Sequence, residues 1–100
     1  MWFFIHNTNA PDAASCKPAH AHAHRDYLRA AQDRMVTAGP YFGADGETRI
    51  GSVFIVDFPD LDAARRWIEA EPYTRHGIYA RHAIHRYDHL WPKQPNGDDS

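Results

Sequence analysis

Apolar and polar residues follow two different periods along the chain, and the period changes at proline, glycine and aspartate positions. Residues 2–6 are aromatic and β-branched, which is typical of a short buried strand, and residues 7–14 form a polar loop. No glycine or further proline interrupts residues 18–34, and Pro18 is tolerated in a first helical turn because its missing N–H needs no partner there. The pattern therefore predicts a strand, a loop and a helix.

The middle of the chain has the pattern of a β-hairpin. Residues 35–38 form a brief apolar strand that Gly39-Pro40 is expected to stop, and residues 50–58 form a longer one. Between them, residues 43–46 combine two glycines with an aspartate, which is turn chemistry. Two adjacent antiparallel strands are expected here.

A second helix and a last strand complete the pattern. Asp60 is placed to cap a helix over residues 61–70, since its carboxylate accepts bonds from early backbone N–H groups. The main helix must end at Glu71-Pro72, because a residue before proline is pushed out of helical geometry. One short turn follows over residues 72–77, and residues 78–87 alternate as a strand with two different faces.

The predicted order is β-α-β-β-α-β, which indicates an α+β, ferredoxin-like fold with a four-stranded antiparallel sheet and two helices on one face. The other face of the sheet is left bare, and pairing two such faces across a two-fold axis would cover it. We therefore expect a homodimer. One domain is predicted over residues 1–90, followed by a disordered tail at 91–100, which after Trp91 has no apolar residue to bury.

Composition narrows the function mainly by exclusion. The formal net charge is −2 and the Lys and Arg residues are scattered, so nucleic acid is not an expected partner. Cys16 is the only cysteine, which rules out an intrachain disulfide and favours a reducing compartment. The apolar segment at the start is too short for a signal peptide or a membrane span, so we expect a soluble, cytoplasmic protein. Eight histidines are the one compositional oddity.

Helical spacing selects one of these histidines. Leu28, Ala31 and Met35 recur near one turn apart on the first helix and define the face that meets the sheet. His24 lies one turn before Leu28 on that face, whereas His22 shares the solvated face with charged residues. A lone histidine on an apolar face is more often a packing residue than a functional one, so His24 needs a partner to count as a site.

An acid occupies the corresponding position on the second helix. Leu61, Ala64, Ile68 and Glu71 recur at intervals of three and four residues, so the Glu71 carboxylate continues the inward stripe. One interpretation is structural: Glu71 caps the next turn or pairs with Arg75. The other is a His24/Glu71 pair in which the acid fixes the imidazole tautomer and raises its basicity for proton transfer. The sequence leaves both open.

Three short motifs in this order resemble the YciI-like (YCII-related) family over residues 2–88: His24-Arg25-Asp26-Tyr27-Leu28, Ala38-Gly39-Pro40 and Glu71-Pro72-Tyr73. The resemblance implies a small ferredoxin-like dimer of the dimeric α/β barrel type, with a pocket centred on a histidine and an aspartate. Glu71 departs from that aspartate by one methylene, which puts the transfer of a catalytic role in doubt because proton-transfer geometry tolerates little displacement. In an alignment with family members whose first helix is longer, His22 rather than His24 would match the family's histidine.

The functional hypothesis is acid–base chemistry, with His24 and Glu71 as catalytic residues acting by proton transfer or elimination on a small aromatic or enolisable metabolite. The family includes a dehydrochlorinase of a chlorinated hydroxyquinol, which implies elimination. Two alternatives stay open: a non-catalytic module that binds a small acid or serves assembly, and a metal site on His20 and His24, which are one turn apart. No cofactor is expected, since no nucleotide-binding fingerprint occurs. The candidate substrate-binding residues are Tyr27, Gly39, Pro40, Ser52, Tyr73 and His82.

Overall fold

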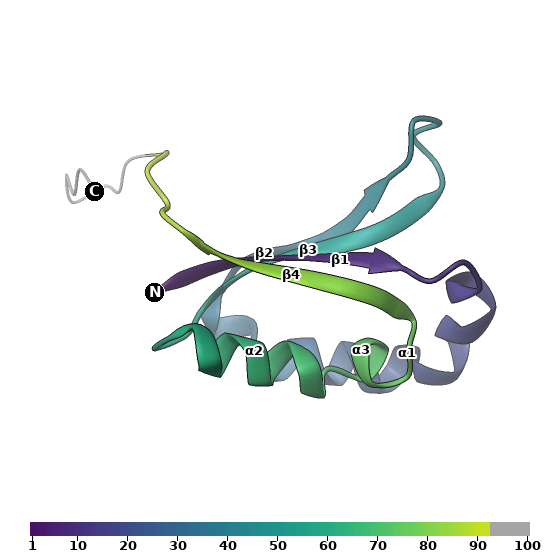
Figure 1. The fold of residues 1–100 in the computed structure, drawn as a ribbon, viewed down its shortest axis with the longest axis horizontal. Helices are drawn as coiled ribbons and strands as arrows, with labels where there is room; N and C mark the ends of the chain where they lie inside the picture. Colours follow the sequence, from purple (N-terminus) through teal and green to yellow (C-terminus); the bar gives the residue numbers. More distant parts are fainter. Residues whose placement is uncertain (93–100) are drawn as a thin grey trace.

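A computed structural model describes residues 1–92 of the chain. Figure 1 shows a sheet with helices packed along one of its two faces. The elements in chain order are β1 (Trp2–Asn9), α1 (Ala13–Ala30), a 3₁₀ turn (Gln32–Arg34), β2 (Met35–Phe42), β3 (Arg49–Asp57), α2 (Leu61–Ala70), α3 (Pro72–Arg75) and β4 (Tyr79–Tyr87).

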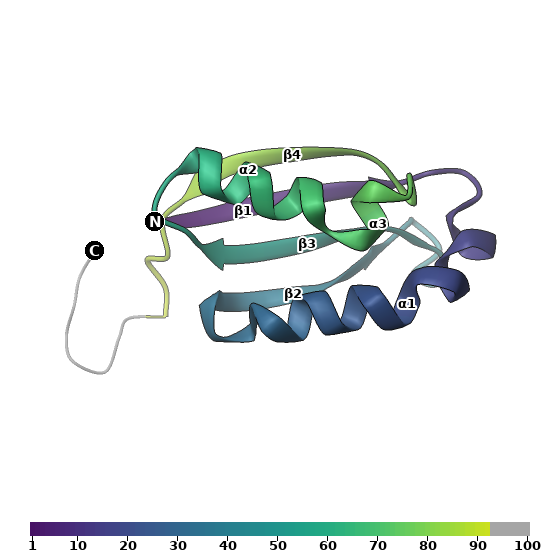
Figure 2. The ribbon, with the colours of Figure 1, turned by 90° about the horizontal axis from the view of Figure 1, so that it is seen from below.

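The strands form one antiparallel sheet in the order β2-β3-β1-β4, which confirms the predicted ferredoxin-like α+β fold. Seen from the helix side in Figure 2, α1 runs along the β2 side of the sheet and α2 along the β4 side. Strand alternation places every second side chain under the helices, and Phe3, Ile5, Phe54 and Val56 are the buried apolar residues of the two central strands. Ile68 of α2 packs onto them.

Three predicted boundaries in the first third of the chain are wrong. The first strand runs to Asn9, three residues further than expected, because polar Asn7 and Thr8 continue the ladder with β3 and β4. The first helix begins at Ala13, so Pro18 lies inside it and removes one helical hydrogen bond. It ends at Ala30, and the 3₁₀ turn takes up the rest of the predicted span.

The second strand also differs from the prediction, because Gly39 and Pro40 do not stop it. Pro40 pairs with Ser52 in the ladder, and the strand continues to Phe42. β2 is at the edge of the sheet, where a residue without an N–H is tolerated if that side of its backbone faces away from the neighbouring strand. The second helix, by contrast, spans 61–70 as predicted, with the Asp60 carboxylate accepting a bond of 2.8 Å from the N–H of Ala63.

A bulge in β4 changes which of its residues face inward. Thr8 pairs with Arg81, but the next residue of β1, Asn9, pairs with Tyr79, so Ala80 is an extra residue in the ladder. Simple alternation would put Tyr79 on the face opposite Ile84. The bulge instead turns Tyr79 toward the helices, where it is buried beside Ile78.

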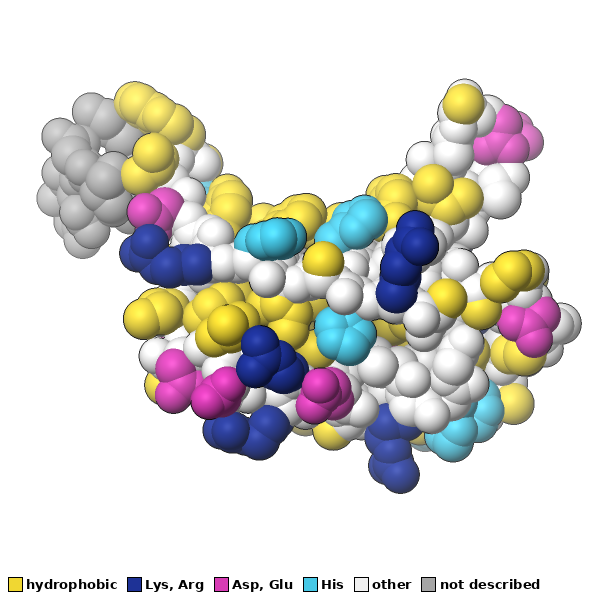
Figure 3. All heavy atoms as spheres, viewed as in Figure 1, with side chains coloured by type: hydrophobic (Ala, Val, Ile, Leu, Met, Phe, Trp, Pro, Cys, Tyr) yellow, Lys and Arg dark blue, Asp and Glu magenta, His cyan; other side chains and the backbone are white. Residues whose placement is uncertain are grey.

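The face of the sheet away from the helices is open. Hydrophobic and histidine side chains gather along this side in Figure 3, between the β2–β3 hairpin and the chain beyond β4. Phe4 and His6 alternate with the buried residues of β1, and the His6 ring stacks on Tyr41 with centroids 4.9 Å apart. Within residues 1–92, no helix combines the length and apolar character that a membrane crossing requires. Most of the tail predicted to be disordered, residues 93–100, lies outside the described residues.

Candidate functional site

The structure joins the two ionisable residues that helical spacing had selected. Nδ1 of His24 on α1 is hydrogen-bonded to Oε1 of Glu71, the residue between α2 and α3. The Glu71 side chain is 0% exposed and that of His24 is 15% exposed. His22 is 86% exposed and pairs with Asp26 on the same helix, so His24 is the histidine that meets the acid.

Glu71 uses its two carboxylate oxygens for different tasks. Oε2 accepts hydrogen bonds from the backbone N–H groups of Tyr73, at 3.0 Å, and Thr74, at 3.3 Å, and so caps α3. Oε1 is thereby directed to His24. The cap and the contact with His24 are therefore both present, because one carboxylate makes both. The glutamate side chain, one methylene longer than the aspartate that the family resemblance implies, reaches both sets of partners.

Aromatic rings hold the imidazole from two sides. The His24 ring stacks on Tyr73 with centroids 3.8 Å apart and an interplanar angle of 5°. Tyr79 meets it edge-on, at 6.5 Å and 84°, and also meets Tyr73 edge-on. With Nδ1 engaged by Glu71 and one ring face covered, the free nitrogen of His24 is Nε2, which has no hydrogen-bond partner among residues 1–92.

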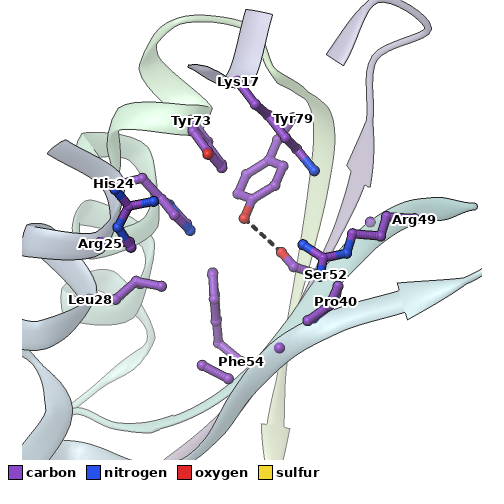
Figure 4. Close-up of a pocket in the computed structure, with 13 residues that line it drawn as sticks. Lys17, His24, Arg25, Leu28, Pro40, Arg49, Ser52, Phe54, Tyr73 and Tyr79 are labelled. Carbon is purple, nitrogen blue, oxygen red and sulfur yellow. Dashed lines mark hydrogen bonds between the residues drawn. The ribbon is translucent and has the colours of Figure 1, made fainter. Parts of the chain in front are cut away.

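His24 lines a cavity of about 320 Å³ between α1 and the sheet. This volume is near the lower end of the range for small-molecule sites, about 300–1,000 Å³, so the cavity suits a ligand with a single ring. Figure 4 shows the side chains around it. The lining residues are Lys17, His24, Arg25, Leu28, Ala38, Gly39, Pro40, Arg49, Gly51, Ser52, Phe54, Tyr73 and Tyr79.

A short chain of polar groups runs from buried Asn7 to Ser52 and Tyr79, which line the cavity. Buried Asn7 donates from Nδ2 to Oγ of Ser52 at 3.2 Å, and the Ser52 hydroxyl donates to the Tyr79 hydroxyl at 2.8 Å. Because the Tyr79 oxygen accepts this bond, its own proton is free to be donated to a ligand. Tyr79 is a site residue that the sequence analysis missed, since only the bulge in β4 turns it inward.

The phenols near the site stay protonated at neutral pH. Burial, and then the negative charge of Glu71, raises the pKa of Tyr73 and also that of Tyr27. The pKa of Tyr79 is raised most, mainly by burial, although the bond from Ser52 acts in the opposite direction. All three hydroxyls are therefore hydrogen-bond donors rather than bases.

Five of the predicted residues, His24, Gly39, Pro40, Ser52 and Tyr73, line the cavity, while Glu71 lies behind His24. Two other predicted residues do not line it. The Tyr27 hydroxyl donates to the Trp67 carbonyl at 2.7 Å and ties α1 to α2, away from the cavity. His82 pairs with Asn7 in the sheet but is outside the lining.

His20, the residue proposed with His24 for a metal, stacks on His76 with centroids 3.8 Å apart. In the part of the chain that the structure describes, no group of three or more His, Cys, Asp or Glu residues is arranged to hold a metal ion.

Three cationic residues in the lining were not predicted: Lys17, Arg25 and Arg49. Lys17 precedes His24 by seven residues, which is two helical turns, so both lie on one face of α1. The predicted helix start at residue 18 excluded Lys17 from this comparison. Partial burial and the nearby charge of Arg49 lower the pKa of the Lys17 ammonium, so the positive charges at the cavity repel each other.

Solved structures of other proteins share the fold of this chain. A dehydrochlorinase acting on 5-chloro-2-hydroxyhydroquinone, from Burkholderia phenoliruptrix and solved in complex with 2,5-dihydroxybenzoquinone, superposes with a TM-score of 0.80 and 26% identity, covering 89% of this chain and 95% of its own. A cofactor-independent oxygenase from Streptomyces nogalater superposes with a TM-score of 0.50 and 17% identity, covering 92% of this chain and 96% of its own, and supports the fold alone.

Sequence relatives identify the family. A Haemophilus influenzae protein is 31% identical over 87 residues, which are 80% of this chain and 89% of the relative. Protein YciI of Escherichia coli is 36% identical over 64 residues, which are 59% of this chain and 65% of that protein. The family of YCII-related domains matches residues 1–88. The chain is therefore a member of the YCII-related domain family.

Proposed function

We propose that this protein is a small enzyme that moves a proton on, or eliminates a leaving group from, a small aromatic or enolisable metabolite. The observation that carries the proposal is the buried Glu71 carboxylate bonded to Nδ1 of His24 at the edge of a ligand-sized cavity. A histidine held by an acid in this way is the usual arrangement of a general base or acid.

The proposed chemistry follows from which nitrogen of His24 is free. A proton on Nδ1 that is donated to Glu71 leaves the lone pair of Nε2 available to the ligand. Nε2 takes a proton from the substrate, and the electron pair of the broken bond forms a new π bond. In an elimination the leaving group departs with the electron pair of the bond that held it. The substrate thus loses one proton and one anion. The Tyr79 hydroxyl is the donor to a substrate oxygen that gains charge in this step.

The relative solved with a dihydroxybenzoquinone supports this substrate class. This relative is 26% identical over 89% of this chain. That degree of identity supports a site in the same place more than it supports the same substrate. A hydroxylated ring also fits this cavity, since the lining combines apolar side chains with phenol and serine hydroxyls. We therefore include ring ketones and halogenated hydroquinones in the proposed class.

A substrate screen with two readouts tests the proposal. Halide release from halogenated hydroxyhydroquinones reports elimination, and exchange of C–H for deuterium in cyclic ketones, followed by NMR, reports proton transfer. His24→Ala and His24→Gln should each lower the rate by about a hundredfold or more, which is the usual contribution of a general base. His22→Gln is the matched control, because His22 is exposed on the same helix, and it should leave the rate unchanged.

Two results would overturn the proposal. One is turnover that survives both His24 variants. The other is a wild-type protein that binds ring compounds but converts none of them, which would favour the alternative of a non-catalytic binding module.

The functional unit that we propose is a homodimer formed through the open face of the sheet. Phe4, Val53 and Ile55 lie on that face, since they alternate with the residues buried under the helices. Phe4 pairs directly with Ile55, so their side chains form a continuous apolar surface across the two central strands. A second copy would cover this surface, as the fold pattern predicts.

A further inference from the structure

The strongest unexplained feature of the cavity is its charge. Lys17 and Arg25 on α1 and Arg49 at the start of β3 come from opposite sides of the space, as Figure 4 shows. Among residues 1–92, no aspartate or glutamate lines the cavity, and Glu71, which lies behind His24, has both oxygens engaged. The three cations therefore face a space with no negative charge of its own.

These cations also lack the carboxylate partners that three other arginines have. Arg29 pairs with Asp26 at 2.8 Å, Arg65 with Asp62 at 3.0 Å, and Arg86 with Asp88 at 3.1 Å. Among residues 1–92, no carboxylate lies within ion-pair distance of the side chains of Lys17, Arg25 or Arg49. The Lys17 ammonium lies 5.9 Å from the centre of the Tyr73 ring, a contact that keeps it near the cavity without neutralising it.

The mutual repulsion of the three cations favours the binding of an anion in the cavity. The pKa of Lys17 is lowered by partial burial and by the charge of Arg49. A lowered pKa is expected for cations that lie close together without a counter-ion. An anionic ligand removes the repulsion, and guanidinium groups bind a carboxylate through two parallel hydrogen bonds each. The charged side of the cavity is thus complementary to a planar anion.

The rest of the lining fits an apolar ring. Leu28, Pro40 and Phe54 form an apolar wall, and the ring face of Tyr73 is already covered by His24. A ligand with its anionic group at the cations and its ring against this wall would bring a ring or side-chain hydrogen toward Nε2 of His24. The cavity volume of about 320 Å³ leaves room for one ring and one such group.

We propose that, within the class of ring compounds given above, the preferred substrate is one that carries a carboxylate: a small planar organic acid whose carboxylate is bound by Arg25, Arg49 and Lys17 while its ring lies beside His24. This inference rests on the proposed function for the reaction, but the recognition of the carboxylate stands on the cations alone. It assigns to Lys17, Arg25 and Arg49 the role of substrate-binding residues that determine specificity.

The test compares benzoate with benzamide, which has the same shape and no charge. Titrations followed by ¹H–¹⁵N NMR should give clear binding of benzoate, with shifts at residues of the lining, and binding of benzamide that is at least about tenfold weaker. Arg25→Gln and Arg49→Gln should each weaken benzoate binding by about tenfold, and the double variant should abolish it. Arg29→Gln, one turn from Arg25 and paired with Asp26, is the control and should bind benzoate normally.

Further arms separate this inference from its alternatives. Inorganic phosphate should compete poorly with benzoate, because it lacks the ring; equal competition would overturn the inference in favour of a general anion site. Equal binding of benzamide, or benzoate binding that survives the double variant, would also overturn it. His24→Gln should keep benzoate binding while losing turnover of any substrate that the screen finds. A wild-type protein that binds benzoate through these arginines but catalyses nothing would refute the proposed function and leave this inference standing.

Discussion

The carboxylate of Glu71 is shared between the imidazole of His24 and the first turn of α3. One oxygen is hydrogen-bonded to Nδ1 of His24, and the other accepts the backbone N–H groups of Tyr73 and Thr74. Because the cap fixes the carboxylate, it also fixes the direction from which His24 is held. The capping of a four-residue helix thereby orients the proposed base.

Glu71→Gln should separate the chemical role of this residue from its structural one. The amide oxygen can still cap α3, but the neutral group no longer favours a proton on Nδ1 or an imidazolium at His24. We expect the rate on any substrate found by the screen to fall by about a hundredfold or more, and the free energy of unfolding to fall by about 1–3 kcal/mol. Steady-state kinetics and urea unfolding measure the two effects.

Glu69→Gln provides the control for that experiment. Glu69 is an exposed acid on α2 two residues before Glu71, so the same change of charge should leave both rate and stability close to those of the wild type. A Glu71→Gln protein as active as the wild type would mean that the carboxylate serves only as a cap.

The His24/Glu71 pair could be predicted because each residue continues a local apolar stripe. The spacing of Leu28 from His24, and of Ile68 from Glu71, depends only on the helical repeat, so no knowledge of tertiary structure was needed. The helices then had to pack on the same face of one sheet, which the order of elements dictated. The helical spacing could not show that the Glu71 carboxylate both caps α3 and contacts His24, since this depends on where α3 begins.

The residues that sequence reasoning missed depend on register and helix start. Tyr79 faces the cavity only because the bulge at Ala80 shifts the β4 ladder, and no periodicity rule reveals a single extra residue. Lys17 was missed because Pro18 was taken for the first turn, although the helix begins at Ala13. Arg49 reaches the cavity from a strand end, and the reach of a long side chain depends on the surrounding packing.

Gly51 should tolerate no side chain, in contrast to Gly39. A Cβ atom built at Gly51 would lie 2.0 Å from the carbonyl oxygen of Asn7 and 2.4 Å from the Tyr41 ring, whereas at Gly39 nothing lies within 4 Å. We expect Gly51→Ala to lower the free energy of unfolding by about 3 kcal/mol or more, and Gly39→Ala to change it by less than about 1 kcal/mol. Urea unfolding of both variants checks this, and equal effects would contradict the close approach of Tyr41 to the β3 backbone.

Ile55→Lys should break the proposed dimer. Ile55 lies on the open face of the central strand β3, and an unpaired ammonium buried between two sheets costs several kcal/mol. Light scattering coupled to gel filtration should give a dimer for the wild type and a monomer for this variant. Leu61→Lys, at an exposed position that begins α2 in the helix layer, is the control and should remain dimeric. A monomeric wild type, or a dimeric Ile55→Lys variant whose circular dichroism matches the wild type, would refute this interface.

Asp45 should make the β2–β3 turn sensitive to acid. Its carboxylate accepts bonds from the N–H groups of Glu47 and Thr48, both at 2.9 Å, and from the Thr48 hydroxyl at 2.6 Å. These bonds, led by the one from the Thr48 hydroxyl, lower the pKa of Asp45 from 3.8 to about 2. The pKa is therefore lower in the folded state, so the contribution of Asp45 to stability is complete above pH 3.8 and is lost as the pH falls toward 2.

Asp45→Asn tests this pH dependence of stability directly. The variant should be less stable than the wild type at neutral pH, and the difference in unfolding free energy should shrink as the pH falls from about 4 to about 2, where the wild-type carboxyl is itself becoming neutral. Urea unfolding at a series of pH values measures the difference. Glu47→Gln removes a charge from the same turn, but the Glu47 side chain makes no hydrogen bond among residues 1–92. This variant should therefore lower the stability at neutral pH less than Asp45→Asn does. A difference between Asp45→Asn and the wild type that stays constant down to pH 2 would show that the three bonds do not depend on the charge of Asp45.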